Sequence, residues 1–329
     1  MPCLQHVLRT SDFQNSLTSS QGLAVAVSGG ADSMALLHAL MLFCQDHKIN
    51  LTAISVDHGL RPEAKGEAQM VADWCVGQGV QHHLLTWQGD KPDTALQSSA
   101  RKARYDLMAQ RCLALGIAHL CVAHHQDDQA ETFLMRLASG SGLNGLGAMR
   151  AVHAYDDRLT LLRPLLGVPK DELIAYCAHH KLPYCNDPSN QSDKYARVRV
   201  RKSMDILTEE GLSAKRLSVT ALRLARAESA LDYYAAQIWQ TRQYSGEKII
   251  LDAKILQDHP PEMMVRIVAR MIEALGHDKD YLPRMEKIEA LSAALRDDDV
   301  FKGRTLGGVI FARDDKAGKI TATPEVSLA

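Results

Sequence analysis

Residues Leu23–Ser33 read LAVAVSGGADS, and this stretch decides the fold that we expect. Leu23–Val27 is an apolar, strand-like segment, and a helical pattern begins directly after the last serine. Paired glycines permit backbone torsions that other residues resist, so successive N–H groups can converge on an anion. The start of the following helix adds the positive end of its dipole at the same place. The stretch therefore predicts a phosphate-binding loop between a strand and a helix.

Asp32 lies inside this loop, where a carboxylate would repel phosphate unless a cation bridged the two. Magnesium binds carboxylates and phosphates together, so Asp32 is a candidate Mg²⁺ ligand. The alternative interpretation of S-G-G alone is an ordinary glycine turn, but the strand before it and the helix after it favour the phosphate site. The loop lacks the G-x-x-x-x-G-K-[ST] pattern of kinases and GTPases, which argues against transfer of a γ-phosphate.

Apolar runs and helical patterns alternate on both sides of the loop. The expected strands are Gly22–Val27, Leu51–Val56, Ala118–Ala123 and the apolar run Leu159–Leu166. The expected helices are Ser33–Asp46, Arg61–Gln78, Thr94–Leu115, Asp127–Ala138 and Lys170–His180. This alternation is typical of βαβ units, so we predict an α/β domain whose parallel sheet carries helices on both faces.

The pattern changes after about residue 203. Long amphipathic helices are expected over Leu207–Gln240, Glu262–Leu275 and Pro283–Leu295, followed by a strand at Gly303–Ala312. A chain of 329 residues is long enough for more than one domain. We therefore predict a catalytic domain over residues 1–212 and a smaller, mostly helical domain over residues 213–329.

The bulk composition is that of an ordinary globular protein, with 46% hydrophobic and 23% charged residues. Because the net charge is only −1, a nucleic-acid enzyme would need its basic residues clustered. The 7 cysteines are scattered without a C-x-x-C pair, which favours reduced thiols over disulfides or a zinc site. No apolar run has the length of a membrane span, so we expect a cytoplasmic protein without a membrane partner. Nothing in the sequence indicates an oligomeric state.

Asp57 and His58 come just beyond the predicted strand Leu51–Val56. By itself, D-H-G is more often a turn than a site. Its position at the carboxyl end of a parallel strand, the edge where open α/β sheets bind ligands, favours a ligand contact.

The segment His124–Thr132 (HHQDDQAET) directly follows another predicted strand. If Asp127 or Asp128 begins a helix, Glu131 lies four or three positions later, so the carboxylates share one face. Such acids bind a cation, either Mg²⁺ or the ammonium group of a substrate. The structural alternative is that they stabilise the first turn of the helix through its dipole.

Three further segments are candidates for binding anions, each with a simpler alternative. Ser99–Tyr105 (SARKARY) places Arg101 and Arg104 on a helix, where charged residues usually mark a solvated face. The glycine-rich segment that contains Gly142 permits a close backbone approach or is only a flexible loop. Arg163 neutralises phosphate charge or pairs with a surface acid.

The segment Asp187–Lys202 (DPSNQSDKYARVRVRK) carries a run of basic residues. Arg197, Arg199 and Arg201 alternate as in an exposed strand or extended segment. Few acids lie in the segment that follows, whereas its basic residues are Lys202, Lys215, Arg216, Arg223 and Arg226. This local excess is the clearest candidate in the chain for a surface that follows a phosphate backbone.

The motifs together resemble those of a known group of enzymes. SGGADS (Ser28, Gly29, Gly30, Ala31, Asp32, Ser33) is similar to the SGGxDS signature of PP-loop ATP pyrophosphatases. In that superfamily the loop holds the pyrophosphate end of ATP, which is cleaved between the α- and β-phosphates. Segments over roughly residues 22–202 resemble tRNA(Ile)-lysidine synthases in the family's order: SVDHGLRPEA, HHQDDQAET, GSGLNGLGAM, RPLL and RVRVR. Val198 stands where that family commonly has asparagine, so any role of the asparagine is absent or moved.

The resemblance implies that ATP and Mg²⁺ are cofactors and that L-lysine and a tRNA(Ile) with a CAU anticodon are substrates. The wobble cytidine would be adenylated at C2 and then attacked by the ε-amine of lysine, and the second domain would contact the tRNA. The implied metal ligands are Asp32 and Asp128. The implied catalytic residues are Asp32, Asp127, Asp128, Glu131 and Arg197. In addition to Ser28–Ser33, the residues implied to lie near ATP are Asp57, His58, Arg104, Gly142 and Arg163.

Three other functions remain as alternatives. A tRNA thiolase of the same superfamily generally needs a cysteine pair or an iron–sulfur cluster, and no C-x-x-C is present. A small-molecule amide synthetase would act without nucleic acid. A catalytically inactive tRNA-binding protein is disfavoured because the SGGxDS signature is intact.

Overall fold

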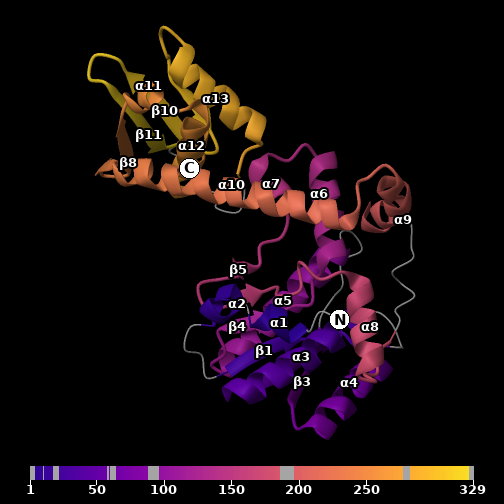
Figure 1. Ribbon diagram of the computed structural model, residues 1–329. Helices are drawn as coiled ribbons and strands as arrows, with labels where there is room; N and C mark the ends of the chain where they lie inside the picture. Colours follow the sequence, from indigo (N-terminus) through magenta and orange to yellow (C-terminus); the bar gives the residue numbers. More distant parts are fainter. Residues whose placement is uncertain are drawn as a thin grey trace. The chain divides into compact units, whose positions relative to one another are not determined.

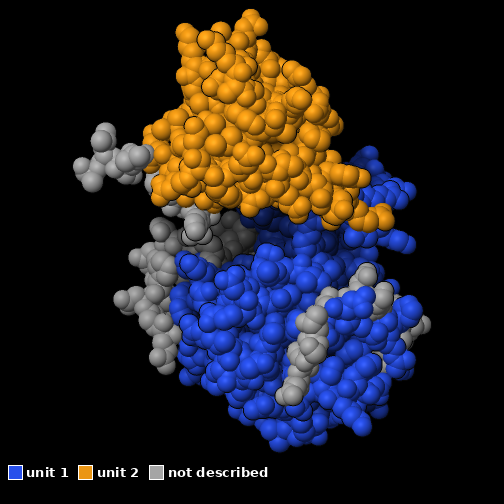
Figure 2. Space-filling model, turned by 90° about the vertical axis from the view of Figure 1, so that its left-hand side faces the viewer, with its two compact units in different colours: residues 1–223 blue, residues 224–329 orange. Residues whose placement is uncertain are grey.

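The computed structural model describes residues 4–9, 11–17, 22–57, 59, 64–87, 96–185, 196–276 and 282–325. The chain divides into two compact units, Met1–Arg223 and Leu224–Ala329 (Figure 2). The division falls inside one long helix, α10 (Ala214–Gln240), a little beyond the expected boundary at residue 212.

A six-stranded sheet forms the centre of the first unit. Its strands are β1 (Gly22–Ala26), β2 (Asn50–Asp57), β3 (Gln81–Thr86), β4 (His119–Cys121), β5 (Val152–Ala154) and β6 (Thr160–Leu162). Their order across the sheet is β3-β2-β1-β4-β6-β5, and every neighbouring pair is parallel except β5 with β6. The predicted parallel α/β sheet is therefore confirmed.

Helices cover both faces of this sheet, as expected (Figure 1). The longer ones are α3 (Ala31–His47), α4 (Ala64–Gln78), α5 (Leu96–Ala114), α6 (Gln126–Ala138), α8 (Lys170–His179) and α9 (Ala196–Glu209). The short ones are α1 (Leu4–Leu8), α2 (Ser11–Ser16) and α7 (Leu143–Leu146). Leu23 and Val25 of β1 pack in a core with α3 and α8, whereas Ala24 packs in a second core with α5. Alternate residues of each strand therefore face different helices.

The expectation of an extended segment at Arg197, Arg199 and Arg201 is wrong, because these residues lie in α9. The alternation of arginine with Val198 and Val200 is typical of a strand, but tertiary contacts override it, since Glu131 of α6 pairs with both Arg197 and Arg201. In a helix, Arg197 and Arg201 are four residues apart and share one face, while Arg199 points elsewhere.

The second unit combines helices with a five-stranded antiparallel sheet. Besides the end of α10, its helices are α11 (Ile255–Asp258), α12 (Pro261–Leu275) and α13 (Met285–Asp297). The strands are β7 (Gln243–Ser245), β8 (Lys248–Asp252), β9 (Arg304–Leu306), β10 (Val309–Asp314) and β11 (Lys319–Pro324). They pair in the order β7-β8-β11-β10-β9.

The single strand expected at Gly303–Ala312 is a hairpin instead. Gly307 and Gly308 have φ values of +61° and +74°, and they separate β9 from β10. Two successive residues with positive φ form the tight turn that antiparallel hairpins favour, and glycine adopts it without steric cost.

Within the described ranges, no helix is long and apolar enough to cross a membrane. The six described cysteines are free thiols, five of them buried: Cys44, Cys75, Cys112, Cys121 and Cys177, with Cys185 half-buried.

A buried ion pair joins α10 to α12 inside the second unit. Arg266 donates from Nη1 to Glu228 Oε1 at 2.9 Å and from Nη2 to Oε2 at 2.6 Å. The two side chains are only 12% and 10% exposed. This bidentate pair holds the C-terminal half of α10 to the core of the unit.

Replacing Arg266 with alanine should destabilise the second unit by about 3–5 kcal/mol, because the Glu228 carboxylate stays buried without a counter-charge. Hydrogen exchange of α10 and α12 during chemical unfolding measures this. Arg296→Ala, which removes an exposed pair with Asp297, is the control and should leave the exchange unchanged. An equal response to both substitutions would contradict the importance of the buried pair.

Candidate functional site

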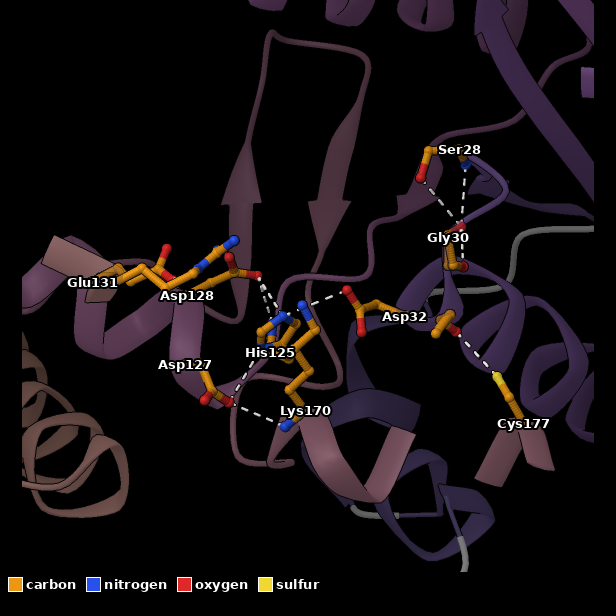
Figure 3. Close-up of polar contacts among 12 residues, drawn as sticks. Ser28, Gly30, Asp32, His125, Asp127, Asp128, Glu131, Lys170 and Cys177 are labelled. Atoms are coloured by element: carbon orange, nitrogen blue, oxygen red, sulfur yellow. Dashed lines mark hydrogen bonds and ion pairs between the residues drawn. The ribbon is translucent and has the colours of Figure 1, made fainter. Parts of the chain in front are cut away.

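The phosphate-loop candidate forms the connection between β1 and α3. Gly29 has φ +85°, a conformation that favours glycine, and Gly30 is the N-cap residue of α3. The Ser33 hydroxyl donates to the Gly30 carbonyl at 3.0 Å and accepts from the Ser28 backbone N–H at 3.2 Å (Figure 3). No side chain caps α3, so the N–H groups of its first turn face the loop without a protein cap. The arrangement matches an anion site at a helix start.

Hydrogen bonds from other elements hold this loop in place. The Ser55 hydroxyl of β2 donates to the Val27 carbonyl at 2.8 Å, where β1 passes into the loop. Ser55 Oγ also lies 2.9 Å from His82 Nε2 of β3, and because its one proton goes to Val27, His82 is the donor. The Cys177 thiol of α8 donates to the Ala31 carbonyl at 3.3 Å (Figure 3). Nothing in the sequence pattern singled out Ser55, His82 or Cys177, because their roles depend on contacts between distant strands and helices.

Three predicted acids surround His125, the N-cap residue of α6 (Figure 3). His125 Nε2 lies 3.5 Å from Asp32 Oδ2 and 3.5 Å from Asp128 Oδ2, and Nδ1 lies 3.4 Å from Asp127 Oδ2. Burial by itself would lower the pKa of His125, but the neighbouring carboxylates of Asp127, Asp32 and Asp128 raise it to about 9. A protonated imidazole therefore neutralises part of this acidic cluster.

The acidic cluster suits a magnesium ion shared with a phosphate ligand. In the described ranges, no three or more His, Cys, Asp or Glu side chains are grouped so that they could hold a metal ion. However, Asp32 Oδ1 is buried and has no hydrogen-bond partner, and Asp128 Oδ2 lies 3.5 Å from the same His125 Nε2 atom that Asp32 contacts. Magnesium commonly takes one or two protein carboxylates and completes its shell with phosphate oxygens and water. Asp32 fits that role, and Asp128, whose Oδ1 accepts from Arg197 and whose Oδ2 accepts from the His125 backbone N–H, would share its oxygens with the ion.

Glu131 has a different environment from the other acids. Its side chain is 2% exposed, and its two oxygens accept from Arg197 Nε at 2.6 Å and from Arg201 Nε at 2.7 Å. Arg197 Nη2 also donates to Asp128 Oδ1 at 2.9 Å. Glu131 therefore attaches α9 to α6, and Arg197 connects that contact to the acidic cluster. Asp127 is more open, with 42% of its side chain exposed, and it accepts from the backbone N–H of Lys170 at 3.0 Å.

His124 lies beside His125 in the chain but in the opposite electrostatic environment. Burial, together with the positive charges of four nearby arginines, lowers the pKa of His124 to about 2. These are Arg163, Arg101, Arg197 and Arg104. Arg163 is 7% exposed, and its Nη1 donates to the Arg150 carbonyl at 2.8 Å. Two predicted anion-binding residues, Arg104 and Arg163, are thus brought together.

The remaining predicted residues lie as follows. Asp57 ends β2, and its Oδ1 accepts from the Gly59 N–H at 2.7 Å. His58 and residues 187–195 lie outside the described residues. Gly142 is the N-cap residue of α7, and an added Cβ there would meet nothing within 4 Å. No close backbone approach within the described part of the chain therefore requires glycine at residue 142.

Comparisons with known proteins agree with this geometry. A family model described as a PP-loop domain matches residues 4–207. The tRNA(Ile)-lysidine synthase of Rhodopseudomonas palustris is 39% identical over 282 residues, which cover 84% of this chain and 81% of that protein. The tRNA(Ile)-lysidine synthase of Bradyrhizobium diazoefficiens is 39% identical over 289 residues, covering 85% and 79%.

Among solved structures, the U34-tRNA thiolase NcsA from Methanococcus maripaludis, determined with its [4Fe-4S] cluster, is similar with a TM-score of 0.57. The similarity covers 68% of this chain and 78% of the thiolase at 19% sequence identity. At that identity the likeness concerns the fold only.

The contact between α6 and α9 gives a prediction for Glu131→Gln. The substitution removes the charge from two hydrogen bonds to arginines, and such bonds contribute about 1.5–3 kcal/mol each. We expect faster hydrogen exchange across α9 with little change in β1 and β2. An exchange rate in α9 equal to that of the unaltered protein would contradict the docking role of Glu131.

Proposed function

The chain belongs to the tRNA(Ile)-lysidine synthase family of PP-loop proteins, and on that premise we propose that it attaches lysine to a tRNA. The substrate is the wobble cytidine in the CAU anticodon of a tRNA(Ile). ATP activates C2 of the base, the ε-amine of L-lysine replaces the activated oxygen, and AMP and pyrophosphate leave. We place this ligase activity in the cytoplasm.

The observation that carries the proposal is the meeting of the phosphate loop with the acidic cluster. Asp32, in the first turn of α3, lies 3.5 Å from the histidine that also contacts Asp127 and Asp128 of α6. An anion site with an adjacent acidic cluster suits a nucleotide phosphate, its metal ion and a substrate amine. A structural helix cap would not need the unpartnered, buried Asp32 Oδ1.

The residues present suit each chemical step. The oxygen on C2 of cytosine is a poor leaving group, so it first attacks the α-phosphate of ATP while pyrophosphate departs toward the Ser28–Ser33 loop. Mg²⁺ held by Asp32 and Asp128 would neutralise negative charge on that pyrophosphate. Lysine then forms the C2–N bond, and the C2–O bond breaks with release of AMP.

The ε-amine of lysine must lose a proton to act as a nucleophile. Glu131 is occupied by two arginines, whereas the Asp127 side chain is 42% exposed. We therefore assign the amine to Asp127, which orients the ammonium group for loss of its proton to water.

The second unit is proposed to contact the tRNA. The helix α10 carries the exposed basic side chains of Lys215, Arg216 and Arg223 in the first unit and of Arg226 in the second. An exposed basic helix in a chain of net charge −1 is suited to a phosphate backbone.

The test of the proposed function is which component triggers pyrophosphate release from ATP. We expect release with tRNA(Ile) that carries CAU, and not with the same tRNA in which the wobble cytidine is replaced by uridine. Release that needs a free acid and ammonia but no RNA would instead indicate the small-molecule amide synthetase. A need for a sulfur donor would indicate the thiolase.

Asp32→Asn should reduce pyrophosphate release by at least about 100-fold, because stabilising developing charge at such a position contributes roughly 2.7–4 kcal/mol. The fold should stay intact, since Asp32 lies at the loop and not in a core. Circular dichroism and a pyrophosphate assay at several Mg²⁺ concentrations measure the two effects. Near-normal turnover at ordinary Mg²⁺ would remove Asp32 from the metal site.

The two acids at the start of α6 should affect different steps. Asp127→Asn is expected to slow lysine transfer while adenylation of the tRNA continues, whereas Asp128→Asn should slow both. Adenylated tRNA is measured without lysine, and lysine transfer is then followed after a single addition of labelled lysine. If Asp127→Asn slowed adenylation as much as transfer, Asp127 would belong with the metal ligands.

A further inference from the structure

Three arginines form a cluster on the α5 side of the sheet. Arg101 and Arg104 belong to α5, and the Cζ atom of each lies 5.3 Å from the centroid of the Tyr105 ring. Arg163 follows β6 directly and is 7% exposed. Its Nη1 bonds to the Arg150 carbonyl, but its Nε is buried without a hydrogen-bond partner. We call Arg101, Arg104 and Arg163 the arginine cluster.

The positive charge of this cluster is not balanced by acids in the described part of the chain. The ion pairs nearby join Arg197 and Arg201 to Asp128 and Glu131, but none joins a cluster arginine to a described carboxylate. Burial also lowers the pKa of Arg104 and of Arg163. A desolvated cation without a partner is costly, so the cluster is suited to a bound anion.

Side-chain alternation separates this cluster from the phosphate loop. Val122 and Leu161 pack in the α5 core. His124 lies two residues after Val122 and Arg163 two residues after Leu161, so both point to the α5 side of the sheet. Cys121 and Leu162 pack in the α3 core, on the side of His125 and Asp32. The phosphate loop and the arginine cluster therefore lie on opposite sides of the carboxyl edge of the sheet. The anion at the cluster is then a different group from the pyrophosphate held at α3.

We propose that the arginine cluster binds the backbone phosphates that flank the target cytidine of the tRNA. This inference rests on the proposed function and identifies the part of the substrate that the α5 side holds. An unpaired anticodon base that enters the carboxyl edge must bring its own phosphates to the rim of the pocket. Planar guanidinium groups match phosphate oxygens with paired hydrogen bonds.

Two other anions are available, the α-phosphate of ATP and the carboxylate of lysine. The KM for ATP of Arg104→Ala, measured below, tests the first, and charge balance disfavours the second. Free lysine carries one carboxylate but two ammonium groups, so its net charge is positive and three arginines would repel it. Each phosphodiester carries one negative charge. The two phosphodiesters that flank one nucleotide therefore neutralise most of the positive charge of the three arginines. The acidic cluster around His125 is better suited to the amines of lysine.

The test uses an anticodon stem-loop RNA with CAU in which the two phosphates flanking the wobble cytidine are replaced by neutral methylphosphonates. The unaltered protein should bind this RNA about 10- to 100-fold more weakly than the natural RNA, because charge-assisted hydrogen bonds to the arginines disappear. The slope of log affinity against log salt should fall by about 0.7 for each phosphate that the arginines no longer neutralise. A methylphosphonate pair in the stem is the RNA control.

Arg104→Ala should weaken binding of the natural RNA similarly and should be nearly insensitive to the methylphosphonates. Arg111→Ala, seven residues further along α5, is the matched control and should behave like the unaltered protein. The assignment is overturned if the unaltered protein binds both RNAs equally. It is also overturned if Arg104→Ala and the methylphosphonates, applied together, reduce the affinity by the product of their separate factors. A third contradicting result is that Arg104→Ala raises only the KM for ATP or only the KM for lysine.

The same experiment separates the arginine assignment from the proposed function. If the unaltered protein modifies CAU loops but ignores the flanking phosphates, only the arginine assignment fails. If it shows no preference for CAU over a uridine-substituted loop, the proposed function itself fails.

Discussion

The chemistry of this site depends on side-chain alternation at the end of β4. Successive residues of an extended strand point to opposite faces of a sheet, so His125 meets the acids of α3 and α6 while His124 meets arginines of α5. The parallel pairing of Ala24 with Leu120 and of Leu120 with Leu161 sets this register. A slip of one residue would exchange the two histidines and reverse the polarity around each.

The register also explains why the Ser28–Ser33 loop, the acidic cluster around His125 and the arginine cluster lie along the same edge of the sheet. Parallel strands bring their carboxyl ends to one edge, so the loop after β1, the acids after β4 and Arg163 after β6 follow one another across the sheet. Between them the chain offers a backbone anion site, an acidic cluster and a basic cluster. Adenylation followed by amine attack needs all three kinds of environment, because it involves a polyphosphate, a metal ion, an ammonium group and a nucleic acid backbone.

The sequence was sufficient for the features that local patterns determine. The apolar run before SGGADS and the acids after Ala123 lie at strand ends, and parallel pairing then brings Asp32 and Asp128 to the same histidine. The half-polar strand β3 (QHHLLT) has no apolar run and was missed, while Gly307-Gly308 was a hairpin signal that could have been recognised. The pairing of Glu131 with arginines of α9 was beyond local patterns, because about seventy residues separate them.

The proposed activity joins lysine to the wobble cytidine of a tRNA(Ile) through an ATP-activated intermediate. Mass spectrometry of anticodon fragments tests it most directly, after the purified protein is incubated with tRNA(Ile) bearing CAU, ATP, Mg²⁺ and lysine. We expect the wobble cytidine to gain the mass of lysine less one water, only when ATP and lysine are both present. An unmodified cytidine under these conditions, or the gain of a sulfur atom in place of lysine, would contradict the proposed activity.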